Sequence, residues 1–287
     1  TPTPTTLLSS AASDVYKRQP PKPRGRVLRA CDSVAMVAAS DPLSSPDPHL
    51  DPVVAANYDE AEAARFDPAA VGPAVNLLAS LAGSGSAVEF AVGTGRLALP
   101  LAETGVAVHG IDFSEAMLAE LQEKPGAARI ALRQGDMTST QVCSDSSLVY
   151  LVFNTITNLR RQAQQVACFR NAAAHPAPGG RFVVENGVPK LHQLPAGETI
   201  HPFDVSPEHL GFDEYVDLVD QISVPHRCFI DGDKVRTQSS IFRYVWPSEL
   251  DLMAKLAGLE LEYRWADWHR RPFTGNDTDH VSVWRKP

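Results

Sequence analysis

Two closely spaced glycines form the clearest candidate for a ligand-binding loop in this sequence. An apolar run breaks into Gly93-Thr94-Gly95 and is followed by residues 96–102, which favour a helix. Glycines allow a tight turn in which backbone N–H groups at the helix start face a ligand, with no Cβ atoms in the way. We therefore predict a strand, a glycine turn and a helix that bind a nucleotide-like cofactor. The spacing Gly93-x-Gly95-x-x-Ala98 also satisfies the dinucleotide fingerprint, so neighbouring residues must separate the two kinds of cofactor.

Acidic residues mark the ends of three successive predicted strands. These residues are Glu89, Asp112 and Asp136. In an open α/β sheet, ligands bind outside the carboxyl ends of the strands. Asp112 is therefore placed to accept hydrogen bonds from ribose hydroxyls, and Asp136 from an adenine amino group, with Met137 packed on the base. Because unpaired carboxylates are rarely buried, a core pattern does not explain all three acids, and we predict that they are functional.

On these motifs, the chain resembles the class I S-adenosylmethionine-dependent methyltransferases over residues 58–284. The resemblance implies that Glu89 lies near the amino-acid end of the cofactor, that Asp112 binds the ribose and that Asp136 binds the adenine. Family members often have glycine where this chain has Ala91, which is a mild departure within the loop. The residues that we expect to bind S-adenosylmethionine are Tyr58, Glu89, Gly93, Gly95, Asp112, Phe113, Met117, Asp136, Met137 and Asn154.

The remaining pattern predicts an α/β fold with a Rossmann-like, doubly wound sheet of seven strands. Continuous apolar runs are typical of parallel strands that are buried on both faces. Further strands are expected over residues 106–111, 129–133, 148–153, 181–185, 259–265 and 281–284, and helices over 115–124, capped by Ser114, and 162–174. The resemblance implies that the last strand lies antiparallel between strands five and six. We also expect a turn over residues 178–180 and a capping box over residues 248–251.

A long insert separates strand five from the last helix. A class I core needs only a short link there, so residues 187–246 must do something else. Strands are expected over residues 215–223, 227–230 and 235–244, with a hairpin turn at Asp231-Gly232-Asp233. We predict a small antiparallel sheet over the mouth of the site. The amino-sugar N-methyltransferases, which the chain distantly resembles, use such a sheet to shape the acceptor pocket or a homodimer contact; a structural flap is the alternative.

The expected reaction is methyl transfer by in-line displacement to a small-molecule acceptor with a nitrogen or oxygen nucleophile. A sulfonium is already a good leaving group, so the protein mainly aligns the nucleophile and excludes water. Asn154 and Thr155, at the end of strand four, are candidates for contacting cofactor or acceptor, with turn capping as the alternative. Tyr58 resembles the aromatic residue that closes over the cofactor, and residues 65–67 are expected to join this lid. The candidates for a general base are Glu185, His209 and His226.

Two other functions stay open on the sequence alone. An NAD(P)-dependent oxidoreductase would also carry a glycine turn and a ribose acid. The short-chain enzymes of that kind use a Tyr-x-x-x-Lys pair, and no tyrosine of this sequence has a lysine four places on. A nucleotide-binding protein without catalysis would be separated only by an activity assay.

Composition narrows the partners and the compartment. The 287 residues, 44% of them hydrophobic, suffice for one large α/β domain. The net charge is −8, and residues 1–30 hold six basic side chains and one acidic one, so the rest of the chain is more acidic still and should repel nucleic acid. No apolar run approaches the roughly 20 residues that cross a bilayer, which predicts no membrane partner. Four scattered cysteines without a Cys-x-x-Cys pair favour a reducing compartment, the cytoplasm, and predict no metal site.

The N-terminal segment needs a separate interpretation. Residues 1–52 are rich in Pro, Ser and Thr, and we expect a disordered tail there, with the methyltransferase domain over residues 53–287. The run Asp14-Val15-Tyr16-Lys17-Arg18-Gln19 resembles the translated end of a transposase sequencing adaptor. We therefore expect part of the tail to be foreign to the natural gene, with Met36 as its start.

Overall fold

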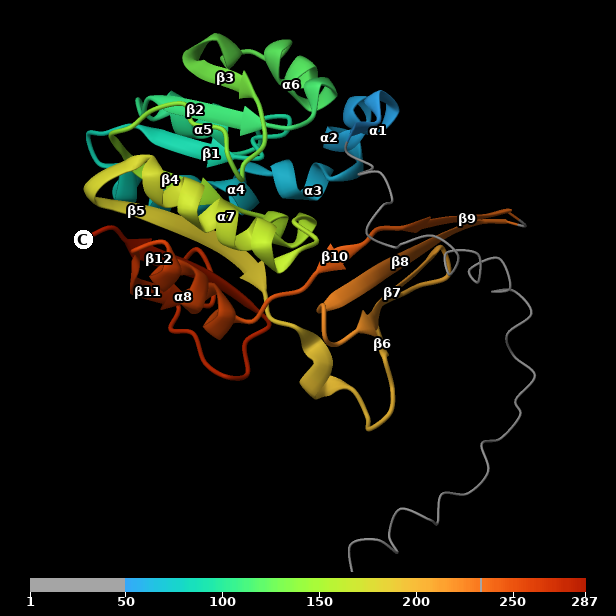
Figure 1. Cartoon of the computed structure of the whole chain (residues 1–287). Helices are drawn as coiled ribbons and strands as arrows, with labels where there is room; N and C mark the ends of the chain where they lie inside the picture. Colours follow the sequence, from blue (N-terminus) through green and yellow to red (C-terminus); the bar gives the residue numbers. More distant parts are fainter. Residues whose placement is uncertain (1–49, 233) are drawn as a thin grey trace, which may run out of the picture. The chain divides into compact units, whose positions relative to one another are not determined.

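The computed structural model describes residues 50–232 and 234–287, so almost all of the predicted tail lies outside the described residues. Within them, the main sheet has seven strands in the order β11-β12-β5-β4-β1-β2-β3 (Figure 1). Its strands are β1 (Ala87–Phe90), β2 (Val108–Asp112), β3 (Ile130–Gln134), β4 (Ser146–Leu151), β5 (Pro176–Gly187), β11 (Glu260–Trp265) and β12 (Asp279–Arg285). β12 runs antiparallel to both of its neighbours. The predicted doubly wound sheet with an antiparallel last strand is confirmed.

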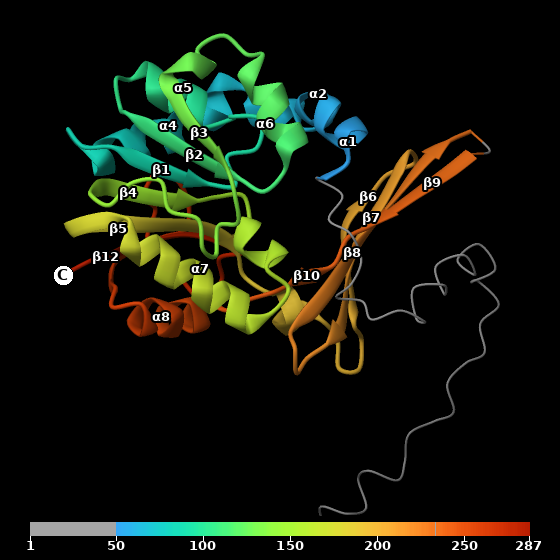
Figure 2. The ribbon, with the colours of Figure 1, turned by 45° about the horizontal axis from the view of Figure 1, so that its top comes forward.

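Helices cover both faces of this sheet (Figures 1 and 2). One core contains residues of α4 (Pro68–Ala82), α5 (Ala98–Glu103) and α6 (Glu115–Gln122), and the other contains residues of α7 (Gln162–Ala174) and α8 (Pro247–Leu256). Successive residues of β4 alternate between the cores, because Leu148 and Tyr150 belong to the first and Val149 and Leu151 to the second. Burial on both faces explains why these strands read as continuous apolar runs.

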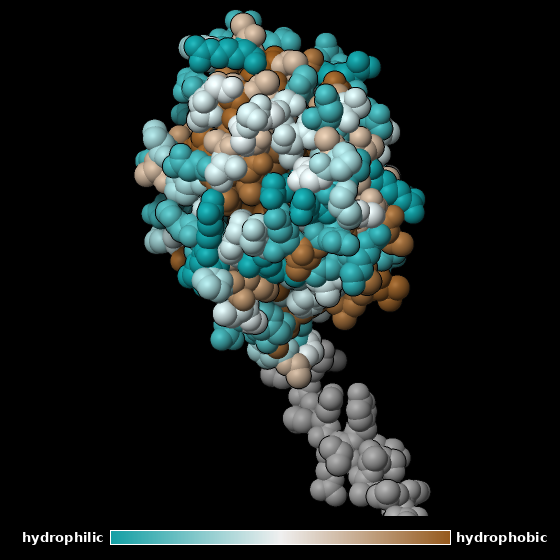
Figure 3. Space-filling model, turned by 90° about the vertical axis from the view of Figure 1, so that its left-hand side faces the viewer, coloured by the Kyte–Doolittle hydropathy of each residue, from teal (hydrophilic) through white to brown (hydrophobic). Residues whose placement is uncertain are grey.

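The surface of the domain is mixed in character. On the face that Figure 3 shows, hydrophilic side chains predominate and the apolar ones form scattered groups. Across residues 50–232 and 234–287, no helix is both long enough and apolar enough to cross a membrane.

The insert forms a second, antiparallel sheet, as predicted. Its strands are β6 (Ile200–Val205), β7 (His209–Asp217), β8 (Ile222–Asp231), β9 (Lys234–Ser239) and β10 (Phe242–Arg243). The single strand expected over residues 215–223 is wrong, because a turn separates β7 from β8. Asp217 Oδ1 accepts hydrogen bonds from the Val219 and Asp220 N–H groups, and Gln221 has a φ of 59°. β6 was not expected from the sequence.

Two smaller predictions are also wrong. Residues 178–180 belong to β5 and not to a turn, because the Gly179 N–H and the Gly180 carbonyl pair with Lys286, just beyond β12. α8 begins at Pro247, with Trp246 as its N-cap, so no capping box forms over residues 248–251. Asp251, the acid that was expected to close that box, pairs with Arg264 instead.

A different arginine, Arg243 of β10, joins the second sheet to the helices of the main domain. Its side chain is 2% exposed and donates hydrogen bonds to Gln165 of α7, to Gln221 and to Glu249 of α8. Burial alone would raise the pKa of Glu249, but hydrogen bonds from Gln162, Arg243 and Gln221 outweigh it and lower that pKa. The ion pair therefore stabilises the fold above the ordinary carboxyl pKa of 4.5, and this contribution is lost as the pH falls through the lowered value.

Glu249→Ala should lower the free energy of unfolding by about 3 kcal/mol, because it leaves the buried guanidinium of Arg243 without its carboxylate. Chemical denaturation at neutral pH measures this loss. Glu260→Ala, at an exposed acid of β11, is the control and should stay within about 0.5 kcal/mol of the parent protein. A loss no larger than that of the control would show that the two glutamines suffice for Arg243.

Candidate functional site

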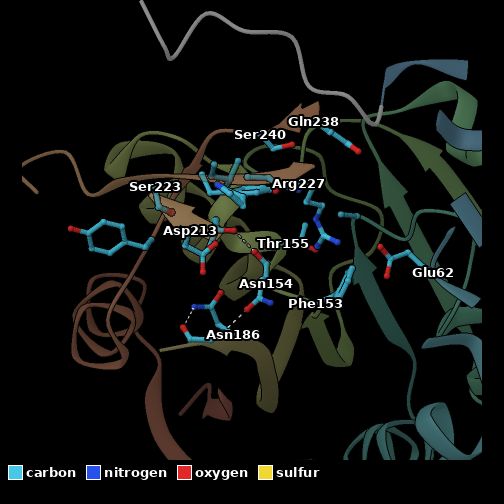
Figure 4. A pocket seen from close by; sticks show the side chains of 18 of the residues that line it. Glu62, Phe153, Asn154, Thr155, Asn186, Asp213, Ser223, Arg227, Gln238 and Ser240 are labelled. Atoms are coloured by element: carbon cyan, nitrogen blue, oxygen red, sulfur yellow. Dashed lines mark hydrogen bonds between the residues drawn. The ribbon is translucent and has the colours of Figure 1, made fainter. Parts of the chain in front are cut away.

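A cavity of about 1550 Å³ lies between the carboxyl ends of the main strands and the second sheet. Ligand pockets usually measure roughly 300–1000 Å³, so this one has room for a cofactor and an acceptor together. Figure 4 shows the side chains that face it from both sides. Because the main strands supply one wall and the insert the other, the site depends on both sheets.

The glycine loop after β1 contains three residues with positive φ, which alternate with Val92 and Thr94. Gly93 and Gly95 have φ values of 55° and 87°, and Ala91 has a φ of 52°. That conformation costs an L-residue roughly 1–2 kcal/mol, which explains why glycine occupies positions 93 and 95. The alanine at position 91 therefore carries an energetic cost. The Gly93 N–H donates to Asp112 Oδ2 at 2.7 Å, so the loop is fixed by the acid at the end of β2.

The three predicted acids take different positions. Asp112 and Asp136 both line the cavity. Asp112 also accepts from the Ser114 N–H at 2.8 Å, and Asp136 accepts from the Thr138 N–H at 2.7 Å. Glu89 is 3% exposed, accepts from the Tyr150 hydroxyl at 2.9 Å and is not part of the cavity wall. Burial raises the pKa of Glu89 to about 8.

The cavity brings together most of the residues that we expected around the cofactor. Gly93 and Gly95 contribute the shape of the loop, and neither is part of the wall. The predicted residues that line the cavity are Tyr58, Asp112, Phe113, Met117, Asp136, Met137 and Asn154.

Short N-terminal helices hold Tyr58 beside the cavity. These are α1 (Pro52–Ala56), α2 (Tyr58–Ala61) and α3 (Ala63–Phe66). Thr94 of the glycine loop donates to Asp59 of α2 at 2.6 Å, and Lys124 pairs with Asp59 while donating to the Thr94 carbonyl. Arg65 lies 4.1 Å from the centre of the Phe153 ring. Of the lid expected over residues 65–67, only Arg65 lines the cavity.

The turn after β4 is strained and held by one carboxylate. Phe153 and Asn154 have φ values of 61° and 59°, a conformation that non-glycine residues keep only where their surroundings impose it. Glu185 accepts from the Phe153 N–H at 2.9 Å and from the Trp268 indole N–H at 2.8 Å. Asn154 Oδ1 accepts from the Gly187 N–H at 2.5 Å. Both oxygens of Glu185 thus have protein donors, and this geometry favours holding the turn over taking a proton from an acceptor.

The two predicted histidines do not line the cavity. His209 pairs with Asp204 at 2.7 Å. His226 lies between Ser239, at 2.8 Å, and Glu214, at 3.1 Å. Along β8 the residues on either side of His226 line the cavity, so alternation turns its side chain to the other face.

The wall formed by the second sheet contains residues that the sequence did not single out. They include Asp213 and Tyr215 of β7, Arg227 of β8 and His201 of β6. Once the register is known, alternation along β7 and β8 places these side chains on one face, since Asp213 pairs with Pro225 and Tyr215 with Ser223. The sequence analysis missed this alternation because it joined the end of β7 and the start of β8 into one expected strand and did not predict β6.

Comparisons with known proteins give a consistent result. A family model described as a methyltransferase domain matches residues 87–180. The CcbJ methyltransferase from Streptomyces caelestis is similar to this chain, with 34% identity and a TM-score of 0.71, and the match covers 81% of this chain and 96% of that one.

Two more distant relatives agree. CalS10, an amino pentose methyltransferase from Micromonospora echinaspora solved with S-adenosylmethionine bound, has a TM-score of 0.60 at 21% identity, over 79% of this chain and 96% of that one. The cypemycin N-terminal methyltransferase of a Streptomyces species is 23% identical over 205 residues, 68% of this chain and 81% of that protein.

Ala91→Gly should raise the free energy of unfolding by about 0.5–1 kcal/mol. Removing the Cβ atom relieves roughly 1–2 kcal/mol of strain at this positive φ, and the extra freedom of glycine in the unfolded chain costs roughly 0.5–1 kcal/mol. Urea denaturation tests this. Ala98→Gly, in the first turn of α5, is the control and should destabilise by about 1 kcal/mol. A less stable Ala91→Gly variant would show that packing of the Ala91 methyl group outweighs the strain.

Proposed function

Because this chain belongs to the class I S-adenosylmethionine-dependent methyltransferases, we propose that it transfers the methyl group of that cofactor to the nitrogen of a small-molecule amine. One observation carries this proposal: a single cavity joins the acids at the tips of β2 and β3 to the polar wall of the second sheet. Such a cavity holds the cofactor at one end and an acceptor at the other.

The residues present fit S-adenosylmethionine. Asp112 and Asp136 would hold its ribose and adenine, and both carboxylates already accept backbone N–H groups that fix their orientation. Met117 and Met137 line the same end of the cavity and would pack on the base. When bound, the cofactor supplies a methyl group on a sulfonium, which suits in-line displacement.

The chain itself would contribute positioning and exclusion of water. Tyr58 and Arg65 line the cavity from the N-terminal helices, where they would cover the bound cofactor. Phe153 and Asn154, in the strained turn after β4, also line the cavity and would help to position the reactants. We infer that Glu185 acts through this turn, because its carboxylate is engaged by Phe153 and Trp268. Holding reactants in line accounts for a large part of catalysis in such reactions.

An amine acceptor is favoured by what the relatives act on. One is named for an N-terminus and another for an amino pentose, so both names include an amine in the acceptor. The alternative role of the second sheet, a homodimer contact, stays a proposal. It is supported by the exposed apolar side chains of Leu210, Ile230 and Val235, which alternation places on the face turned away from the cavity.

S-Adenosylhomocysteine, the demethylated product, should bind and NAD should not, as measured by calorimetry. Asp112→Asn and Asp136→Asn should each weaken binding about tenfold or more, since a hydrogen bond to a charged group contributes roughly 1.5–3 kcal/mol. Melting temperatures separate this loss from unfolding of the loop.

Asp145→Asn, at an exposed acid away from the cavity, is the matched control and should bind like the parent protein. Tight binding of NAD with no response to S-adenosylhomocysteine would overturn the assignment. Unchanged affinity in both cavity variants would show that these two acids do not hold the cofactor.

A further inference from the structure

We propose that Asp213 and Asn186 form the subsite that binds the acceptor's amine, as a cation that gives one proton to the Asp213 carboxylate before its nitrogen takes the methyl group. The inference rests on the proposed function, because it names the part of the cavity that receives the acceptor. It assigns a role to two residues on different sheets, one on β7 and one near the end of β5.

Asp213 is a partly buried carboxylate without a direct partner among the described residues. It lines the cavity, and among the described residues its side chain has no hydrogen bond and no ion pair. Burial raises its pKa above the ordinary 3.8, against the opposing effects of Lys190, His201, Arg227 and His226. A carboxylate in such a place is unfavourable unless a donor reaches it, and a ligand in the cavity is the donor that could.

Asn186 presents a second acceptor without a donor. Its side chain is 2% exposed and lines the same cavity. The Nδ2 group donates to the Gly187 carbonyl at 2.7 Å, and this bond fixes which end of the amide is nitrogen. Oδ1 is therefore the end left over, and it has no hydrogen-bond partner in the described part of the chain. An unpaired buried acceptor of this kind costs stability that a bound donor would recover.

The two acceptors belong to one site. Figure 4 shows Asp213 pointing from the second sheet toward Asn186 and Asn154, which lie near the ends of β5 and β4. Asn154 is already engaged, because its Oδ1 accepts from the Gly187 N–H. The two remaining acceptors, one of them negatively charged, are complementary to a group with several N–H donors and a positive charge.

This complementarity distinguishes an amine from an alcohol. An ammonium group has two or three N–H donors and a charge, whereas a hydroxyl has a single donor. A hydroxyl could satisfy Asp213 or Asn186, but not both. The neighbouring cations do not replace the ligand: Arg227 lies over the Phe203 ring, 5.5 Å from its centre, and forms no ion pair with Asp213.

The test uses two probes of equal size that differ in one group, benzylamine and benzyl alcohol. A ring is chosen because Phe203, Phe229 and Tyr244 line the acceptor side of the cavity. With the protein saturated with S-adenosylhomocysteine, calorimetry should show that benzylamine binds about tenfold or more tightly than the alcohol. Asp213→Asn should abolish that preference and leave the affinity for benzyl alcohol unchanged. Asn186→Ala should reduce the preference.

Asp279→Asn is the matched control, because Asp279 is an acid that lines the same cavity from β12 and is exposed. It should keep the preference for the amine. The preference of the parent protein should also weaken as the pH falls through the raised pKa of Asp213 and its carboxylate gains a proton, and this dependence should be absent in Asp213→Asn. The parent protein and Asp213→Asn both contain His201, His226, Lys190 and Arg227. Comparing these two proteins therefore cancels any contribution of those four groups to the pH dependence.

Three results would overturn the subsite: equal affinity for both probes in the parent protein, no measurable binding of benzylamine, or a preference that survives in Asp213→Asn. Retained binding of S-adenosylhomocysteine in these experiments would leave the proposed function standing. Its loss in the parent protein would instead refute the proposed function itself.

Discussion

The buried guanidinium of Arg243 is the interaction on which the rest of this site depends. It is 2% exposed and binds Glu249 of α8, Gln165 of α7 and Gln221 between β7 and β8. A buried charge is tolerated only when its donors are satisfied, so these partners have to stay in place together. Because α7 and α8 pack on the main sheet while Arg243 belongs to β10, the network fixes the second sheet relative to the strand tips. The cavity exists only when both walls are held.

Carboxylates at strand tips have two roles in this fold. Asp112 accepts N–H groups from Gly93 and Ser114 while it faces the cavity, so the residue that would bind the ribose also closes the loop. Glu185 has only the structural part of this role, since both of its oxygens accept from protein donors. The positive φ angles of Gly93 and Phe153 are therefore maintained by hydrogen bonds from their N–H groups to carboxylates. Glycine alone does not account for these loop conformations. Cofactor binding and loop geometry are coupled as a result.

The second sheet divides its two faces between different tasks. Alternate residues of β7 and β8 line the cavity, Asp213 and Arg227 among them, while the intervening positions carry His226 and apolar side chains. His226 is held by Ser239 and Glu214 and has no access to the acceptor end of the cavity. In the proposed function, an acceptor therefore meets the cavity face of the second sheet and not the face that carries His226. Specificity can vary there without disturbing the cofactor end.

The sequence by itself determined the main sheet, the glycine loop and the acids at the strand tips, because apolar runs, glycines and strand-end carboxylates are local patterns. Helix α7 was predicted at its observed bounds for the same reason. Tertiary structure decided the acceptor end. From the sequence, His209 and His226 were equal candidates for a histidine in the cavity. In the structure, the register of β7 and β8 places His226 on the other face of the sheet, and both histidines contact acids. Asp213 became a candidate because its side chain has no hydrogen bond or ion pair within residues 50–232 and 234–287, which depends on every residue packed around it. The alternation of residues assigns a side chain to one face of a sheet only when the bounds of the strand are known. The turn held by Asp217 ends β7 and separates it from β8, so the strand expected over residues 215–223 had the wrong bounds.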